Sequence, residues 1–104
     1  MSVAEWYKKH ANVPPSVPSW GVWVTFRFDG EERYGFWREI PSSEAMGAAS
    51  FPPTSEETLE IARYEAAREV ELPKEYTIAV AFYNPRRERV GRKSVFTSAQ
   101  IRGK

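Results

Sequence analysis

Residues 20–40 read WGVWVTFRFDGEERYGFWREI and contain the strongest secondary-structure pattern of the chain. On both sides of Asp29-Gly30, apolar side chains recur at every second position, which is the period of a β-strand. Asp-Gly between two alternating segments is a strong signal for a hairpin turn. The sequence therefore predicts a β-hairpin over residues 20–40.

The alternation also predicts how the two strands pair. A two-residue Asp29-Gly30 loop would place the apolar residues of one strand on the face opposite to those of the other. A three-residue loop that includes Phe28, with Gly30 left-handed in a G1 bulge, brings the two apolar sets together, and we expect this loop. The cross-strand pairs are then Arg27–Glu31, Trp23–Gly35 and Gly21–Trp37.

Both faces of this predicted hairpin carry aromatic side chains. Trp23 and Trp37 occupy one face, each opposite a glycine whose backbone an indole ring can cover. This face requires a covering element or a partner, because exposed aromatic patches are costly for solubility. The other face forms the core and consists of Val22, Val24, Phe26, Tyr34 and Phe36.

Capping signals predict two helices. Thr54 and Glu57 have capping-box spacing and begin a helix over residues 55–71, before Pro73. Ser2 and Glu5 have the same spacing and predict a short helix over residues 3–11, followed by a Pro-rich connector. We expect the longer helix to pack on the core face of the hairpin through Leu59, Ala62, Ala66 and Val70.

Two further segments read as strands. Residues 76–83 are strongly β-prone and residues 94–101 less so, with a basic, turn-forming connection at residues 84–93. The sequence thus predicts a single α+β domain: a four-stranded antiparallel sheet of two β-hairpins, one principal helix between them and a short N-terminal helix. We assign residues 1–19 to the N-terminal helix and connector, and residues 20–104 to the α+β domain.

The composition excludes several classes of function. The 104 residues contain no cysteine, which excludes a disulfide scaffold, a thiolate metal site and a cysteine nucleophile. His10 and Asp29 are the only residues of their types, and the hairpin turn already explains the aspartate. No phosphate-binding glycine loop or HExxH motif is present. We expect a non-catalytic protein without a bound metal or cofactor, soluble and cytoplasmic, with no membrane partner.

Charge is distributed unevenly along the chain. Residues 1–84 hold 8 Lys and Arg against 13 Asp and Glu, whereas residues 85–104 hold 7 against 1. Arginine forks bind phosphate well, so this basic hairpin is a candidate for contact with nucleic acid. Charged hairpin tips also protect edge strands, which is the structural alternative. The candidate phosphate-binding residues are Arg86, Arg87, Arg89, Arg92 and Lys93.

The Trp23 and Trp37 face is a second candidate surface. Its indoles, joined by Tyr83 or Phe96, offer stacking surfaces for unpaired bases. Aromatic and arginine side chains are equally typical of protein interfaces. Residues 1–19, folding back, are a third way to cover this face. The arginines nearest to it in the sequence are Arg27 and Arg33.

These observations favour a binding module that contacts nucleic acid through the basic hairpin. The alternative is a protein–protein interaction module: a homodimer through the aromatic face, or a small adaptor or inhibitor such as the accessory proteins of phages and mobile elements. Acidic residues on the longer helix favour the alternative, because they repel nucleic acid. For the aromatic face we expect partial cover by residues 1–19 together with self-association. The acidic residues are Glu56, Glu57 and Glu60.

Overall fold

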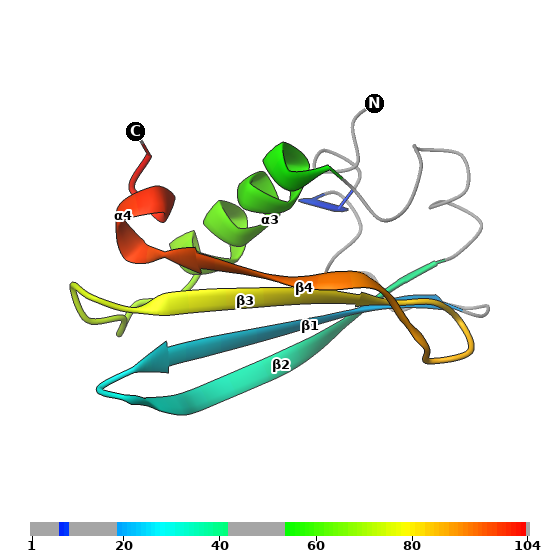
Figure 1. The fold of residues 1–104 in the computed structure, drawn as a ribbon, viewed down its shortest axis with the longest axis horizontal. Helices are drawn as coiled ribbons and strands as arrows, with labels where there is room; N and C mark the ends of the chain where they lie inside the picture. Colours follow the sequence, from blue (N-terminus) through cyan, green and yellow to red (C-terminus); the bar gives the residue numbers. More distant parts are fainter. Residues whose placement is uncertain (1–6, 9–18, 42–53, 104) are drawn as a thin grey trace.

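The computed structural model describes residues 7–8, 19–41 and 54–103, without the side chains of residues 33, 34, 40 and 41. These residues form an antiparallel sheet with the strand order β2-β1-β3-β4 and two helices, α3 and α4, on one side of it (Figure 1). The predicted α+β domain with an antiparallel sheet and a helix is confirmed. The elements are β1 (Ser19–Phe28), β2 (Glu31–Pro41), α3 (Ser55–Ala67), β3 (Thr77–Tyr83), β4 (Arg89–Thr97) and α4 (Ser98–Ile101).

Much of the predicted N-terminal region lies outside the described residues. Tyr7 and Lys8 are helical, and the remainder of the predicted short helix and connector belongs to the undescribed part of the chain. Tyr7 packs edge-on against Tyr64 of α3, with ring centroids 6.0 Å apart. No helix in the described ranges is long and apolar enough to cross a membrane.

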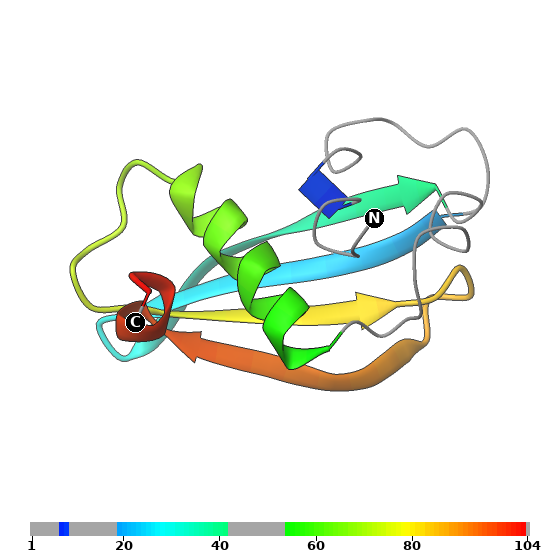
Figure 2. The same ribbon diagram turned by 90° about the horizontal axis from the view of Figure 1, so that it is seen from above.

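The core lies between the sheet and α3, which crosses the strands (Figure 2). Val22, Val24 and Phe26 of β1 are all 0% exposed and alternate along the strand, as expected. The helix contributes Ile61 and Ala62 to the same cluster. The predicted packing of the helix on this face of the hairpin is confirmed. The remaining buried members of the cluster are Tyr7, Ala66, Ile78, Val80, Phe82 and Phe96.

The predicted register of the first hairpin is wrong by two residues. Trp23 pairs directly with Trp37, not with Gly35. Asp29 and Gly30 have φ angles of 58° and 79°, so they form a two-residue turn of type I′ instead of the expected three-residue loop.

A β-bulge explains why the predicted faces are nevertheless correct. The register shifts by one between Phe26 and Arg27, which leaves Arg33 as the extra residue of β2. A two-residue turn without this insertion would send the apolar residues of the two strands to opposite faces. With it, Val24 lies opposite Phe36 on the core face.

The helix α3 begins as predicted and ends earlier. The Thr54 hydroxyl accepts a hydrogen bond from the Glu57 N–H (3.2 Å), and the Glu57 carboxylate accepts one from the Thr54 N–H (3.3 Å). The last helical residue is Ala67 instead of residue 71, because the chain turns back there to enter β3. Val70, expected in the core, is therefore 92% exposed. The buried face consists of Thr58, Ile61, Ala62, Glu65 and Ala66.

The second hairpin also differs from the prediction. β4 begins at Arg89, so half of the predicted basic connection is a strand, because pairing with β3 outweighs the weak β-propensity of its charged residues. Residues 98–101, predicted as strand, form α4. Thr97 caps α4, and its side chain accepts a hydrogen bond from the Gln100 N–H (3.3 Å).

A charged residue lies inside the core. Glu65 of α3 is 0% exposed, and Arg38 of β2 donates hydrogen bonds to both of its carboxylate oxygens at 2.9 and 3.0 Å. The Tyr7 hydroxyl donates a third hydrogen bond to the same carboxylate. Removing one partner of such a buried pair typically costs about 3–5 kcal/mol, because the remaining charge stays uncompensated. The network therefore joins the N-terminal segment, β2 and α3.

Replacing Tyr7 with Phe should lower the free energy of unfolding by about 1–3 kcal/mol at neutral pH, because Glu65 loses a hydrogen bond in the core. Burial and the Glu65 charge raise the pKa of Tyr7, so above about pH 10 only the unfolded chain releases this proton. The stability of the wild type should consequently fall with rising pH in that range. The difference from Tyr7→Phe should be constant from about pH 6 to 9 and shrink above pH 10. Urea unfolding at a series of pH values, followed by tryptophan fluorescence, measures the free energy of unfolding of the wild type and of the variant.

Tyr64→Phe is the matched control. It removes a neighbouring phenol, which accepts a hydrogen bond from Arg68 at 3.1 Å, and leaves the Tyr7–Glu65 contact in place. This variant should retain the fall in stability at high pH. A difference between wild type and Tyr7→Phe that does not change across the whole pH range would contradict the buried hydrogen bond.

Candidate functional site

No helix or strand of the described residues lies over the sheet face opposite α3 and α4 (Figure 1). We call this surface the open face. The strand pairing assigns Trp23, Trp37 and Tyr83 to it, all three partly exposed. The other described residues whose side chains the register places there are Ser19, Gly21, Thr25, Arg27, Glu32, Gly35, Glu39, Thr77, Ala79, Ala81, Arg89, Val95 and Thr97.

Three aromatic rings form the centre of the open face. The ring centroids of Trp23 and Trp37 are 6.5 Å apart, and those of Trp37 and Tyr83 are 5.4 Å apart, with interplanar angles of 42° and 45°. Tyr83 and Phe96, the two residues expected to join the tryptophans, lie on different faces of the sheet. Tyr83 belongs to the cluster, whereas Phe96 is wrong as a candidate because it lies in the core and is 8% exposed.

Glycines make this arrangement possible. A Cβ atom at Gly21 would overlap the six-membered ring of Trp37, so the indole lies directly over the backbone of β1. At Gly35, a Cβ would lie 3.0 Å from the Trp23 ring. Each indole thus covers a glycine, as expected, although the covered glycine is diagonal to it in the ladder rather than directly opposite.

Arg87 connects the basic hairpin to the aromatic cluster. Its guanidinium carbon lies 5.3 Å from the centroid of the Trp37 ring, within cation–π distance. Its N–H groups donate to the Ser19 carbonyl (3.2 Å) and to the Glu39 carboxylate (3.5 Å). The two candidate regions, far apart in the sequence, therefore meet in one surface.

The other four cations of the hairpin are exposed, and three of them belong to the edge strand β4. Arg89 pairs with Tyr83 and faces the open side. Arg92 and Lys93 lie in an irregular stretch of β4, where the register against β3 shifts by two residues. Arg86 lies at the tip of the loop. Arg27, which the sequence assigned to the aromatic face, is exposed next to the turn of the first hairpin, at the other end of the sheet from Arg87. The side chain of Arg33, also assigned to this face, is outside the described residues.

The acidic residues lie on the other side of the molecule. Glu56 and Glu60 are exposed on α3, and Glu60 is 3.6 Å from the Lys8 ammonium. They are thus separated by the sheet from the open face, to which the register assigns two other acidic residues, Glu32 and Glu39. Tyr7, expected to help cover the tryptophans, is buried against α3 instead. Trp6 is outside the described residues.

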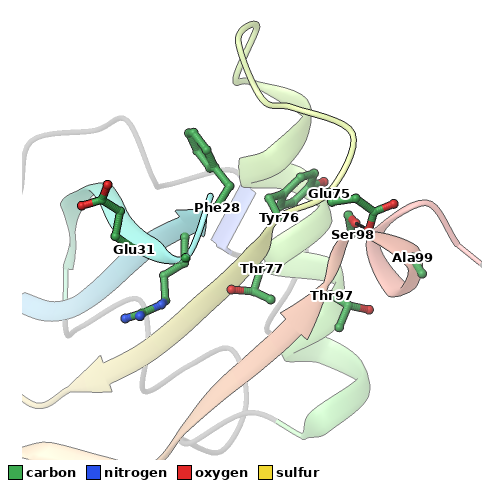
Figure 3. Close-up of a pocket in the computed structure, with 10 residues that line it drawn as sticks. Phe28, Glu31, Glu75, Tyr76, Thr77, Thr97, Ser98 and Ala99 are labelled. Atoms are coloured by element: carbon green, nitrogen blue, oxygen red, sulfur yellow. Dashed lines mark hydrogen bonds between the residues drawn. The ribbon is translucent and has the colours of Figure 1, made fainter.

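A cavity of about 400 Å³ lies at the end of the sheet, next to the turn of the first hairpin (Figure 3). Glu31 flanks one side and Glu75 the other, where the Ser98 hydroxyl donates to the Glu75 carboxylate at 3.5 Å. Burial raises the pKa of Tyr76, which forms part of the wall. Within the described part of the chain, no three His, Asp or Glu side chains gather as a metal site.

Comparison of the chain with models of protein families, with curated proteins and with solved structures finds no match. The open face itself is therefore the basis on which a function is proposed.

Replacing Gly21 with Ala should destabilise the protein by about 1–3 kcal/mol, because the new methyl group displaces Trp37 from the open face. In a Trp37→Leu background the same replacement should cost less, because the indole is absent. Chemical denaturation measures both differences. Gly30→Asn is the matched control, because a Cβ there meets nothing within 4 Å and Asn tolerates the left-handed backbone. Equal costs of Gly21→Ala in the two backgrounds would show that Trp37 does not cover this glycine.

Proposed function

We propose that the protein binds single-stranded nucleic acid on the open face, without catalysis. Aromatic side chains on an exposed sheet are good platforms for unpaired bases, and cations beside them bind the phosphate backbone. The observation that carries the proposal is the position of Arg87 on Trp37, which makes the basic hairpin and the aromatic cluster one continuous surface.

Single strands fit this surface better than a duplex. Stacking on Trp23 or Tyr83 requires the flat face of a base, which a double helix hides. The helices α3 and α4 are on the other side of the sheet, so neither extends from the open face toward a major groove.

Charge favours nucleic acid over a protein partner. The exposed cations of the second hairpin, Arg86, Arg89, Arg92 and Lys93, attract a polyanion, and Arg87 connects this hairpin to the aromatic cluster. The acidic surface of α3 lies on the opposite side. A homodimer through the open face is the competing proposal. It is supported by Val95, a 55% exposed apolar side chain on this face.

The proposal predicts salt-sensitive binding to single-stranded oligonucleotides of about 12 nucleotides. With Arg86, Arg89, Arg92 and Lys93 each contacting one phosphate, the slope of log affinity against log salt should be about −3. Fluorescence anisotropy at about 50 to 200 mM salt measures the slope, with mixed-sequence DNA, RNA and a duplex as ligands. Single strands should bind more tightly than the duplex.

Two variants complete this experiment. Replacing Arg89 and Arg92 with Ala should reduce the magnitude of the slope by about 1.4, because two phosphate contacts are lost. Arg68→Ala removes one cation from the C-terminal cap of α3, on the far side of the sheet, and should leave affinity and slope unchanged. No binding of any single strand at low salt, together with a dimer in light scattering that Trp23→Ala dissociates, would overturn the proposal in favour of the homodimer.

A further inference from the structure

The backbone of Arg87 adopts a conformation that favours glycine. Its φ angle is 69°, in the left-handed region. Within the connection between β3 and β4, Arg87 is the last of the three residues enclosed by the hydrogen bond from the Asn84 N–H to the Glu88 carbonyl (3.0 Å). The Arg87 N–H donates to the Asn84 carbonyl at 2.8 Å, and the Asn84 side chain accepts from the Glu88 N–H at 3.0 Å. Loops of this length commonly place glycine at the left-handed position. An arginine there indicates that its side chain has a role.

The contacts of the Arg87 side chain are unlike those of a phosphate-binding arginine. The guanidinium carbon lies over the Trp37 ring, 5.3 Å from its centroid, and N–H groups donate to the Ser19 carbonyl and the Glu39 carboxylate. A phosphate would have to compete with that carboxylate. The side chain is nevertheless 48% exposed, so part of it remains accessible to a ligand.

We propose that Arg87 holds a nucleobase by stacking, with the base on the outer side of the guanidinium and Trp37 on the inner side. This inference rests on the proposed function and assigns Arg87 a role different from that of the other four cations. Guanidinium planes stack on bases, and their hydrogen bonds to the protein hold the plane in one orientation. Arg87 is thus a base-binding residue, whereas Arg89 and its neighbours bind phosphates.

The two roles differ in their dependence on salt and on the shape of the cation. Stacking needs the planar guanidinium, so Arg87→Lys and Arg87→Ala should both weaken single-strand binding about tenfold, with the salt slope unchanged. At a phosphate contact, charge is sufficient. Arg89→Lys, the matched control, should therefore bind within about twofold of the wild type, and Arg89→Ala should reduce the magnitude of the slope by about 0.7.

A structural role of Arg87 is tested with Arg87→Gly. Glycine removes the side chain and suits the left-handed backbone, so this variant should remain folded by circular dichroism and melt close to the wild type. It should show the same tenfold loss of affinity as Arg87→Ala. A loss of affinity that only accompanies unfolding would identify Arg87 as a purely structural clamp and overturn the inference.

The remaining outcomes separate this inference from the proposed function. If Arg87→Ala lowers the magnitude of the salt slope as Arg89→Ala does, and Arg87→Lys restores it, Arg87 binds a phosphate; the inference is then wrong and single-strand binding stands. If the wild type binds no single strand, both are wrong.

Discussion

The pleat of β1 is the constraint from which both surfaces of the sheet follow. This strand is hydrogen-bonded to β2 on one edge and to β3 on the other, so its side chains can point only to the two faces. Val22, Val24 and Phe26 thereby enter the core, and Trp23 is directed to the open face. A pairing shift of one residue would exchange these two sets. The bulge at Arg33 in β2 preserves them, which shows how strongly apolar burial selects among registers.

The buried carboxylate of Glu65 has a different role. An apolar residue at this position would fill the core without requiring a particular partner, whereas a carboxylate is tolerated only where Arg38 and the Tyr7 hydroxyl meet it. The Arg38 guanidinium also lies over the Phe36 ring, 4.4 Å from its centroid. Because the partners come from β2 and the N-terminal segment, the network selects one orientation of α3 relative to both. It adds specificity to packing that apolar area alone leaves approximate.

The candidate site depends on its glycines as much as on its aromatic rings. Gly21 lies between Glu39 and Tyr83 in one row of the sheet. Because it has no Cβ, the Trp37 indole can lie across β1 and reach the ring of Tyr83. The loop of the second hairpin then places Arg87 over the same indole. Three segments far apart in the chain thus form one surface, and the sheet separates it from the acidic side of α3.

The sequence by itself determined the features that depend on neighbouring residues. Alternation in residues 20–40 predicted the strands, their faces and the burial of Val22 and Val24. Capping-box spacing predicted the start of α3 at Thr54. Thr97 and Gln100 have the same spacing and begin α4, although the weak strand pattern of residues 94–101 had favoured a strand there. Such patterns can be recognised in a sequence because side chains return to the same face every two residues in a strand and every three to four residues in a helix.

Only the tertiary structure decided the features that depend on distant residues. The strand order, the extent of β4, the burial of Glu65 and the contact of Arg87 with Trp37 each join segments that no local pattern connects. The hairpin register shows the boundary between the two kinds of information. The sequence predicted which residues of β2 must face the core, but a loop of three residues and a two-residue turn with a bulge satisfy that demand equally. Burial does not choose between them, because it specifies the face of a residue and not its exact partner.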